Sequence, residues 1–233
     1  LETHEMEEIA RFLRAIPAQD EEYELTFNMP ILEGLPFLEQ FEHSEIFEAE
    51  ESFQLFTQQL LQPELLEFAV PKSLEPMLRD YQKHGYSWLK LLANYGFGGV
   101  LADDMGLGKT IQSIAFIVSE LDIIRANKQP VLIVCPSSLA YNWLYEMLKF
   151  APEIEAIIVD GSTAERRELL SQLDTHDVVI TTYPLLRRDS TFYEKQHFHT
   201  VFFDEAQAFK NPLTQTARTV KKIQATNRFA LTG

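Results

Sequence analysis

Residues 98–110 read GGVLADDMGLGKT: a short apolar run, two acids, and two glycines ahead of Lys109 and Thr110. The apolar run predicts a buried strand, and residues 110–122, TIQSIAFIVSELD, predict an amphipathic helix. A glycine-rich loop between a strand and a helix fits the phosphate-loop pattern G-x-x-x-x-G-K-[ST], although Asp103 occupies the position of the first glycine. This placement makes a chance GKT turn the weaker interpretation.

A loop of this kind offers phosphate oxygens three kinds of partner. Its glycines let backbone N–H groups turn inward, and the helix behind it adds the positive end of its dipole. Lys109 would reach the β- and γ-phosphates, and the hydroxyl of Thr110 would hold Mg2+. The loop residues predicted to contact ATP are Asp104, Met105, Gly106, Leu107, Gly108, Lys109, Thr110 and Ile111.

A second acidic motif, TVFFDEAQ at residues 200–207, places Asp204 and Glu205 directly after an apolar run. If that run is a strand of a parallel sheet, its carboxyl end lies at the same edge as the phosphate loop. Asp204 could then bind Mg2+ or one of its waters, and Glu205 could orient or deprotonate an attacking water. Adjacent acids on a solvated loop are the alternative. We predict Lys109, Asp204 and Glu205 as catalytic residues, with Thr110 and Asp204 at the metal.

Short apolar runs alternate with helical segments through the second part of the chain. The runs are apolar nearly throughout, which is typical of strands covered on both faces. Such strand–helix–strand repeats predict an α/β fold with a mostly parallel sheet and helices on both faces. The expected strands are 98–102, 131–136, 156–161, 177–183, 200–205 and 228–233, and the expected helices are 78–96, 110–122, 137–152, 163–173 and 211–225.

The charge is unevenly distributed along the chain. Residues 1–77 hold 18 acidic and 3 basic residues, and residues 78–233 hold 17 of each, so the first segment carries the whole formal net charge of −15. We therefore place a domain boundary at residue 77 and expect an acidic, mainly helical region before it. Its expected elements are helices over 5–16 and 44–63 and a strand over 23–30. Their apolar stripes are packing surface or a docking face for a protein partner.

The remaining composition points to a cytoplasmic protein. The one cysteine, Cys135, excludes an internal disulfide, and it is expected to be a packed thiol. There is no secretory leader pattern and no apolar run of membrane-spanning length. The sequence begins without Met, so we expect a piece of a longer protein. His197 and His199 lack a third ligand nearby, and we expect surface histidines rather than a metal site.

Taken together, the ordered motifs resemble those of helicase superfamily two. DDMGLGKT is followed by DEAQ at 204–207 and by LTG at 231–233. The segments LRDYQKHGYSWL and LADDMGLGKTIQ are similar to Swi/Snf-type ATP-dependent DNA translocases in particular, in which Asp is usual at the first loop position. The resemblance covers about residues 78–233. It implies the first RecA-like lobe of a P-loop NTPase, from a bacterial, nucleoid-associated protein that hydrolyses ATP with Mg2+ to move along double-stranded DNA.

The resemblance assigns further residues. Gln82 matches the glutamine that reads adenine, although it could be an ordinary helix-surface residue. PSSL at 136–139 and TTY at 181–183 match motifs that contact the DNA backbone, but both could equally be helix N-caps. The LTG motif, Leu231, Thr232 and Gly233, matches the segment that relays ATP state to the DNA contacts.

Two departures from the family pattern matter. Gln207 stands where the family commonly has His; both side chains hydrogen-bond, so we expect coupling to survive in altered form. The chain stops inside LTG, so the second lobe with its arginine fingers is missing, and we expect the 233 residues alone to hydrolyse little ATP.

Three other functions stay open at this point. One is a DNA or RNA helicase that separates strands. Another is a phosphotransferase built on the same loop, which the order of DEAQ and LTG argues against. The third is a docking or autoinhibitory role for the acidic region, which could mimic the charge of DNA.

Overall fold

The computed structural model describes residues 51–61, 68–102 and 106–233. The chain divides into two compact units, residues 1–62 and residues 63–233. In the first unit the described element is helix α3 (Glu51–Leu61), which lies inside the helix expected over 44–63. The helix expected over 5–16 and the strand expected over 23–30 lie outside the described residues.

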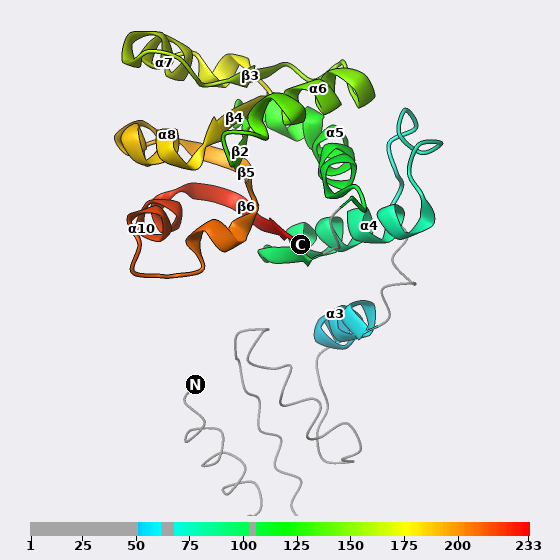
Figure 1. Cartoon of the computed structure of the whole chain (residues 1–233). Helices are drawn as coiled ribbons and strands as arrows, with labels where there is room; N and C mark the ends of the chain where they lie inside the picture. The colour runs from blue at the N-terminus through cyan, green and yellow to red at the C-terminus, as the bar shows by residue number, and fades with distance from the viewer. Residues whose placement is uncertain (1–50, 62–67, 103–105) are drawn as a thin grey trace, which may run out of the picture. The chain divides into compact units, whose positions relative to one another are not determined.

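The second unit is built around a six-stranded sheet in which every neighbouring pair of strands is parallel (Figure 1). This arrangement confirms the predicted parallel α/β fold. The strand order is β1-β6-β5-β2-β4-β3, so the first and last strands of the sheet in sequence are neighbours. The strands are β1 (Gly99–Ala102), β2 (Val131–Cys135), β3 (Ala156–Ile158), β4 (Val178–Thr182), β5 (His197–Asp204) and β6 (Gln224–Thr232).

Helices cover both faces of this sheet, as expected from the sequence (Figure 1). One face packs against α4, α5 and α6, and the other packs against α7, α8, α9 and α10. The helices are α4 (Asp80–Asn94), α5 (Lys109–Asn127), α6 (Ala140–Phe150), α7 (Thr163–Leu170), α8 (Tyr183–Arg188), α9 (Ser190–Tyr193) and α10 (Gln215–Lys222), with 3-10 turns η2 (Leu173–Thr175) and η3 (Ala206–Phe209).

Strand β2 shows why the apolar runs do not alternate with polar residues. Successive side chains of a strand point to opposite faces. Val131, Ile133 and Cys135 belong to the core under α4, α5 and α6. Leu132 and Val134 belong to the core on the opposite face. A strand buried on both faces therefore needs an apolar side chain at every position.

Helix α5 occupies the centre of the first face and begins at the phosphate loop. Its 19 residues run from Lys109 to Asn127. The fully buried ring of Phe116 meets the rings of Phe202 on β5 and Phe229 on β6 edge to face, with centroids 5.9 and 5.4 Å apart. These contacts hold α5 against the strands that end beside its first turn.

A short segment ahead of α4 packs onto the same core. Leu74 is fully buried, and Phe68 and Val70 lie partly buried against the same cluster. The Tyr86 hydroxyl of α4 donates a hydrogen bond to the carbonyl of Ala69 over 2.9 Å. The predicted boundary at residue 77 follows charge, whereas the division after residue 62 follows packing.

The cysteine and two of the histidines lie in different surroundings. Cys135 is buried, and burial together with the nearby Asp204 charge raises the pKa of its thiol to about 12. His197 is exposed, but the expectation of a surface position is wrong for His199, which is 5% exposed and lies 3.3 Å from a Glu120 carboxylate oxygen under α5. In the described part of the chain, no metal-ligand cluster is found and no helix could cross a membrane.

Candidate functional site

Strands β1, β6 and β5 end together at one edge of the sheet. In the parallel register, Ala102 of β1 lies beside Thr232 of β6. On the other side of β6, Asp204 of β5 lies beside Leu231. The loop that follows β1 and the acids that end β5 therefore flank the end of β6, as the sequence predicts for a shared site.

The described part of the phosphate loop needs its glycines for backbone reasons. Gly106 has φ 87° and Gly108 has φ 82°, a left-handed conformation that costs other residues about 1–2 kcal/mol. Helix α5 starts directly afterwards, so Lys109 and Thr110 occupy its first turn. Both are half-buried at the positive end of a long helix. The candidate residues Asp104 and Met105 lie outside the described residues.

Gln82 is buried against this loop, with 8% of its surface exposed. Its Nε2 donates to the carbonyl of Leu107 over 3.0 Å. Its Oε1 accepts from the backbone N–H of Arg79, the residue ahead of α4, over 3.0 Å. The amide thus ties α4 to the phosphate loop. Nε2 also donates to the Tyr81 hydroxyl over 3.5 Å, so both amide donors have partners within the protein. Adenine recognition by Gln82 stays a prediction.

Asp204 is buried and held in place by hydrogen bonds. Its Oδ2 accepts from the indole Nε1 of Trp143 over 2.8 Å, and its Oδ1 accepts from the backbone N–H of Glu205 over 3.0 Å. Burial raises the pKa of its carboxyl group, and the Glu205 charge raises it further. The Trp143 hydrogen bond and, to a smaller extent, the Lys109 cation act to lower this pKa.

Glu205 is connected to the end of β6 through Gln207. Glu205 has the left-handed φ of 52°, which turns the chain sharply away from β5. The Gln207 amide donates to the Glu205 carboxylate, and its oxygen accepts from the Thr232 hydroxyl over 3.1 Å. Gln207 can bridge the two because it carries both a donor and an acceptor. The predicted LTG segment is therefore linked to Glu205 through the side chain of Gln207.

The two candidate DNA-contact loops lie side by side, because β2 and β4 are neighbours and Cys135 pairs with Thr182. Ser137 and Ser138 are exposed, and α6 begins without a side-chain cap. Thr182 instead caps α8 by accepting from the Leu185 N–H over 3.5 Å. The N-cap alternative thus holds for Thr182, whereas the two serine hydroxyls are available to a ligand.

A hollow of about 220 Å3 lies between these loops. Ser137 of the first loop and Thr182 of the second both line it, and so does the carboxylate-bearing Asp160. A phosphate placed here would meet hydroxyl donors but also one negative charge.

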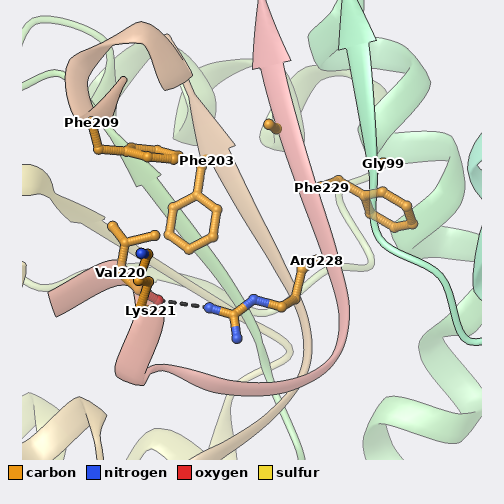
Figure 2. Close-up of a pocket in the computed structure, with 8 residues that line it drawn as sticks. Gly99, Phe203, Phe209, Val220, Lys221, Arg228 and Phe229 are labelled. Atoms are coloured by element: carbon orange, nitrogen blue, oxygen red, sulfur yellow. Dashed lines mark hydrogen bonds between the residues drawn. The ribbon is translucent and has the colours of Figure 1, made fainter. Parts of the chain in front are cut away.

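A separate hollow of about 320 Å3 lies between α10 and strands β5, β6 and β1 (Figure 2). It is lined mainly by apolar side chains, among them Phe203 and Phe209. Its Arg228 guanidinium already donates to the carbonyls of Val220 and Ile223, over 2.6 and 2.9 Å. None of its lining residues belongs to the phosphate loop or the acid pair, and we assign it no chemistry.

Sequence reasoning missed two aromatic residues that contact Asp204. Trp143 donates to its carboxylate, and the Tyr183 hydroxyl donates to its main-chain carbonyl over 2.7 Å. The sequence places Tyr183 in a DNA-contact motif and gives no sign that it neighbours the acid. No local pattern signals either contact, because each joins segments distant in sequence. The available clue is that a buried Trp or Tyr needs a polar partner.

A phosphate loop and an acid pair, brought to one edge of a parallel sheet, define a RecA-like lobe of the P-loop nucleotide-binding class. Residues 81–233 match the family model described as the SNF2-related domain. The chain therefore belongs to the SNF2-related family.

Curated relatives match the same part of the chain. The TATA-binding protein-associated factor MOT1 of Saccharomyces cerevisiae is 34% identical over 189 residues, which is 76% of this chain and 10% of MOT1. The putative ATP-dependent helicase/translocase YwqA of Bacillus subtilis is 38% identical over 170 residues, which is 72% of this chain and 18% of YwqA. The chain thus spans only a small part of these proteins.

A solved structure shares the fold. The Sulfolobus solfataricus SWI2/SNF2 ATPase core in complex with dsDNA is 38% identical, with a TM-score of 0.61, and the match covers 67% of this chain and 32% of that one. The ATPase core domain of the same organism gives 37% identity and a TM-score of 0.58 over 73% of this chain. The predicted RecA-like lobe is confirmed, whereas a bacterial origin stays a prediction.

Proposed function

We propose that the intact protein hydrolyses ATP with Mg2+ in order to move along double-stranded DNA. The donors present suit the ligand: glycine N–H groups and Lys109 for phosphates, with a Thr110 hydroxyl and an Asp204 carboxylate as the hard oxygen ligands that Mg2+ prefers. When bound, the metal would neutralise charge on the phosphates. Glu205 would orient the attacking water.

The observation that carries this proposal is the meeting of two distant motifs at the end of β6. Lys109 begins α5 after β1, and Asp204 ends β5, with one strand between them. The Lys109 cation lowers the pKa of the Asp204 carboxyl, against the larger effect of burial. The chain belongs to the SNF2-related family, and this arrangement favours a role for Asp204 and Glu205 in ATP hydrolysis. The alternative, that the two acids merely lie on a solvated loop, is less well supported.

Support for duplex DNA as the track comes from two sources. The Sulfolobus ATPase core that shares 38% identity was solved in complex with dsDNA. In this chain, the exposed Ser137 and Ser138 lie beside the second candidate loop at the same edge of the sheet. Hydroxyl groups and a helix N-terminus are common partners of backbone phosphate. We propose a cytoplasmic, nucleoid-associated location on the same grounds.

The proposal is tested by measuring ATP hydrolysis by the intact protein with and without duplex DNA. We expect duplex DNA to stimulate the wild-type rate. Lys109→Ala should lower the stimulated rate by at least about 100-fold, because transition-state charge on the phosphates loses its cation. Lys195→Ala, at an exposed lysine before β5, is the matched control and should keep the wild-type rate. Equal rates for the two variants would refute the assignment of the phosphate loop.

A strand-separating helicase is the alternative function. Relatives such as YwqA carry helicase in their names, and an uncharacterized ATP-dependent helicase of Mycoplasma pneumoniae is 40% identical over 156 residues. A strand-displacement assay on the intact protein decides between the two. We expect duplex-stimulated ATP hydrolysis without release of the displaced strand; release of that strand would favour the helicase.

A further inference from the structure

Two buried aromatic side chains hold Asp204 from different directions. Trp143 is 1% exposed, and its Nε1–H donates to Oδ2 of Asp204 over 2.8 Å. Tyr183 is 6% exposed, and its hydroxyl donates to the main-chain carbonyl of the same residue over 2.7 Å. One contact orients the carboxylate and the other fixes the peptide that leads into Glu205.

Each of these side chains is attached to a loop expected to face the duplex. Trp143 lies in the first turn of α6, which begins at Ala140 directly after residues 136–139. Tyr183 ends the segment 181–183 and is the first residue of α8. The two loops are neighbours through β2 and β4 and share one hollow. Both candidate contact loops are therefore connected to the same acid by one side chain each.

The hydrogen bonds fix the orientation of the Asp204 carboxylate. Oδ1 accepts the N–H of Glu205 and Oδ2 accepts the indole N–H of Trp143. These two donors therefore determine the direction of the lone pairs that remain for a metal. Bonds from a neutral donor to a buried carboxylate are strong and directional. Partners that orient a metal-binding carboxylate typically change metal affinity or activity by about 10–100-fold when removed.

We propose that Trp143 and Tyr183 are positioning residues that connect the two duplex-facing loops to Asp204. A shift of either loop on DNA would move the start of α6 or α8 and, through one hydrogen bond, the orientation of the carboxylate. This inference rests on the proposed function, because it assigns the metal to Asp204 and the duplex to the loops.

The test uses Trp143→Phe and Tyr183→Phe in the intact protein. Each variant removes a donor and keeps a ring. Trp88→Phe is the control for the first, because Trp88 is a half-buried tryptophan on α4. Tyr86→Phe is the control for the second, because the Tyr86 hydroxyl also donates to a backbone carbonyl.

The first readout is independent of turnover: calorimetric affinity for Mn2+ in the presence of ADP. We expect Trp143→Phe to weaken Mn2+ binding about 10–100-fold, whereas Trp88→Phe keeps the wild-type affinity. The second readout is kinetic. Trp143→Phe and Tyr183→Phe should lower the ratio of DNA-stimulated to unstimulated kcat, with little change in KM for ATP and in duplex affinity.

Two results would overturn the inference. One is an Mn2+ affinity and stimulation ratio for both variants equal to those of their controls. The other is a loss explained entirely by a lower unfolding temperature. If Trp143→Phe fails to fold, Tyr183→Phe decides by the same measurements. Absence of duplex stimulation in the wild-type protein refutes the proposed function instead, and Mn2+ affinity then decides the positioning of Asp204 alone.

Discussion

At Gly108 the phosphate loop becomes a helix, and two separate constraints exclude a side chain there. The backbone is left-handed, with φ 82°. A Cβ atom at this position would also lie 2.4 Å from Nε2 of Gln82, the atom that holds the Leu107 carbonyl. Gly96 is a useful comparison, because it has φ 70° but a Cβ atom there would meet nothing within 4 Å.

We expect Gly108→Ala to destabilise the protein more than Gly96→Ala. Both variants incur the left-handed backbone cost of about 1–2 kcal/mol, but only Gly108→Ala displaces Gln82 from the loop. Chemical denaturation should give the larger loss of unfolding free energy for Gly108→Ala, and nucleotide titration should show weaker ATP binding for that variant alone. Equal losses and equal ATP affinity would show that the Gln82 contact is unimportant.

Some candidate site residues belong to a contiguous sequence motif, whereas others are brought to the site by contacts between distant segments. Lys109 and Thr110 could be predicted because the strand, loop and helix around them are contiguous. Asp204 and Glu205 could be proposed because Asp204 ends an apolar strand and Glu205 follows it. Trp143 could not, because its hydrogen bond to Asp204 depends on how α6 is rotated against β5. That rotation is set by packing and has no local sequence pattern.

Three elements at the far end of the sheet are joined by one buried carboxylate. Glu120 of α5 pairs with Lys90 of α4 and with His199 of β5. Burial acts to raise the pKa of Glu120, but hydrogen bonds from His199 and Lys90 outweigh it and leave this pKa below its ordinary value of 4.5. The ionised form is therefore more favourable in the folded state than in the unfolded chain.

The lowered pKa of Glu120 predicts the direction in which the free energy of unfolding changes with pH. A depressed folded pKa contributes stability above the unfolded pKa, and this contribution is lost as pH falls through the folded value. At neutral pH, Glu120→Gln should lower the unfolding free energy by roughly 1–3 kcal/mol. Denaturation at several pH values should show the difference from wild type shrinking below pH 4.5.

The matched control is Glu168→Gln, at an exposed glutamate of α7. It should leave the unfolding free energy close to wild type at every pH, since an exposed charge contributes little. A difference for Glu120→Gln that does not change with pH would contradict the assignment of the stabilisation to the ionised carboxylate.

At the level of elements, composition was sufficient to find the strands but not their order. Apolar runs such as VLIVC at 131–135 coincide with buried strands because both faces of the sheet are covered. Strand β6 lies between β1 and β5, but no residue pattern in these three segments predicts that order. The burial of His199 was missed for the same reason, since it depends on α5 crossing that end of β5.

Across the whole molecule, charge and packing divide the chain at different places. The acidic segment extends to residue 77, but Leu74 is fully buried in the core of the second unit. The Ala69 carbonyl also accepts the hydroxyl of Tyr86. Residues 68–77 hold one basic and one acidic residue, Lys72 and Glu75, and they belong to the packed unit that begins at residue 63.

This difference sets the design of a deletion experiment on the acidic region. Removing residues 1–77 should destabilise the remaining protein by several kcal/mol, because the loss of a buried Leu alone costs about 2–5 kcal/mol. Removing residues 1–62 should leave the unfolding temperature of the second unit nearly unchanged. Thermal unfolding followed by circular dichroism compares the two. Equal unfolding temperatures would show that residues 68–77 contribute no packing.

The shorter deletion is the appropriate test of docking or autoinhibition. If the acidic region covers the DNA face, removal of residues 1–62 should raise duplex affinity and the DNA-stimulated rate. Unchanged values would refute that role without the ambiguity of a destabilised lobe.

The pairing of β1 with β6 has a consequence for biosynthesis. Gly99 finds its partner in Phe229, so the strand that carries the phosphate loop emerges from the ribosome long before its neighbour exists. Non-local parallel pairing of this kind slows folding and leaves apolar segments exposed in the meantime. The phosphate loop is thus translated early and assembled late, because β1 has no sheet neighbour until translation reaches β6.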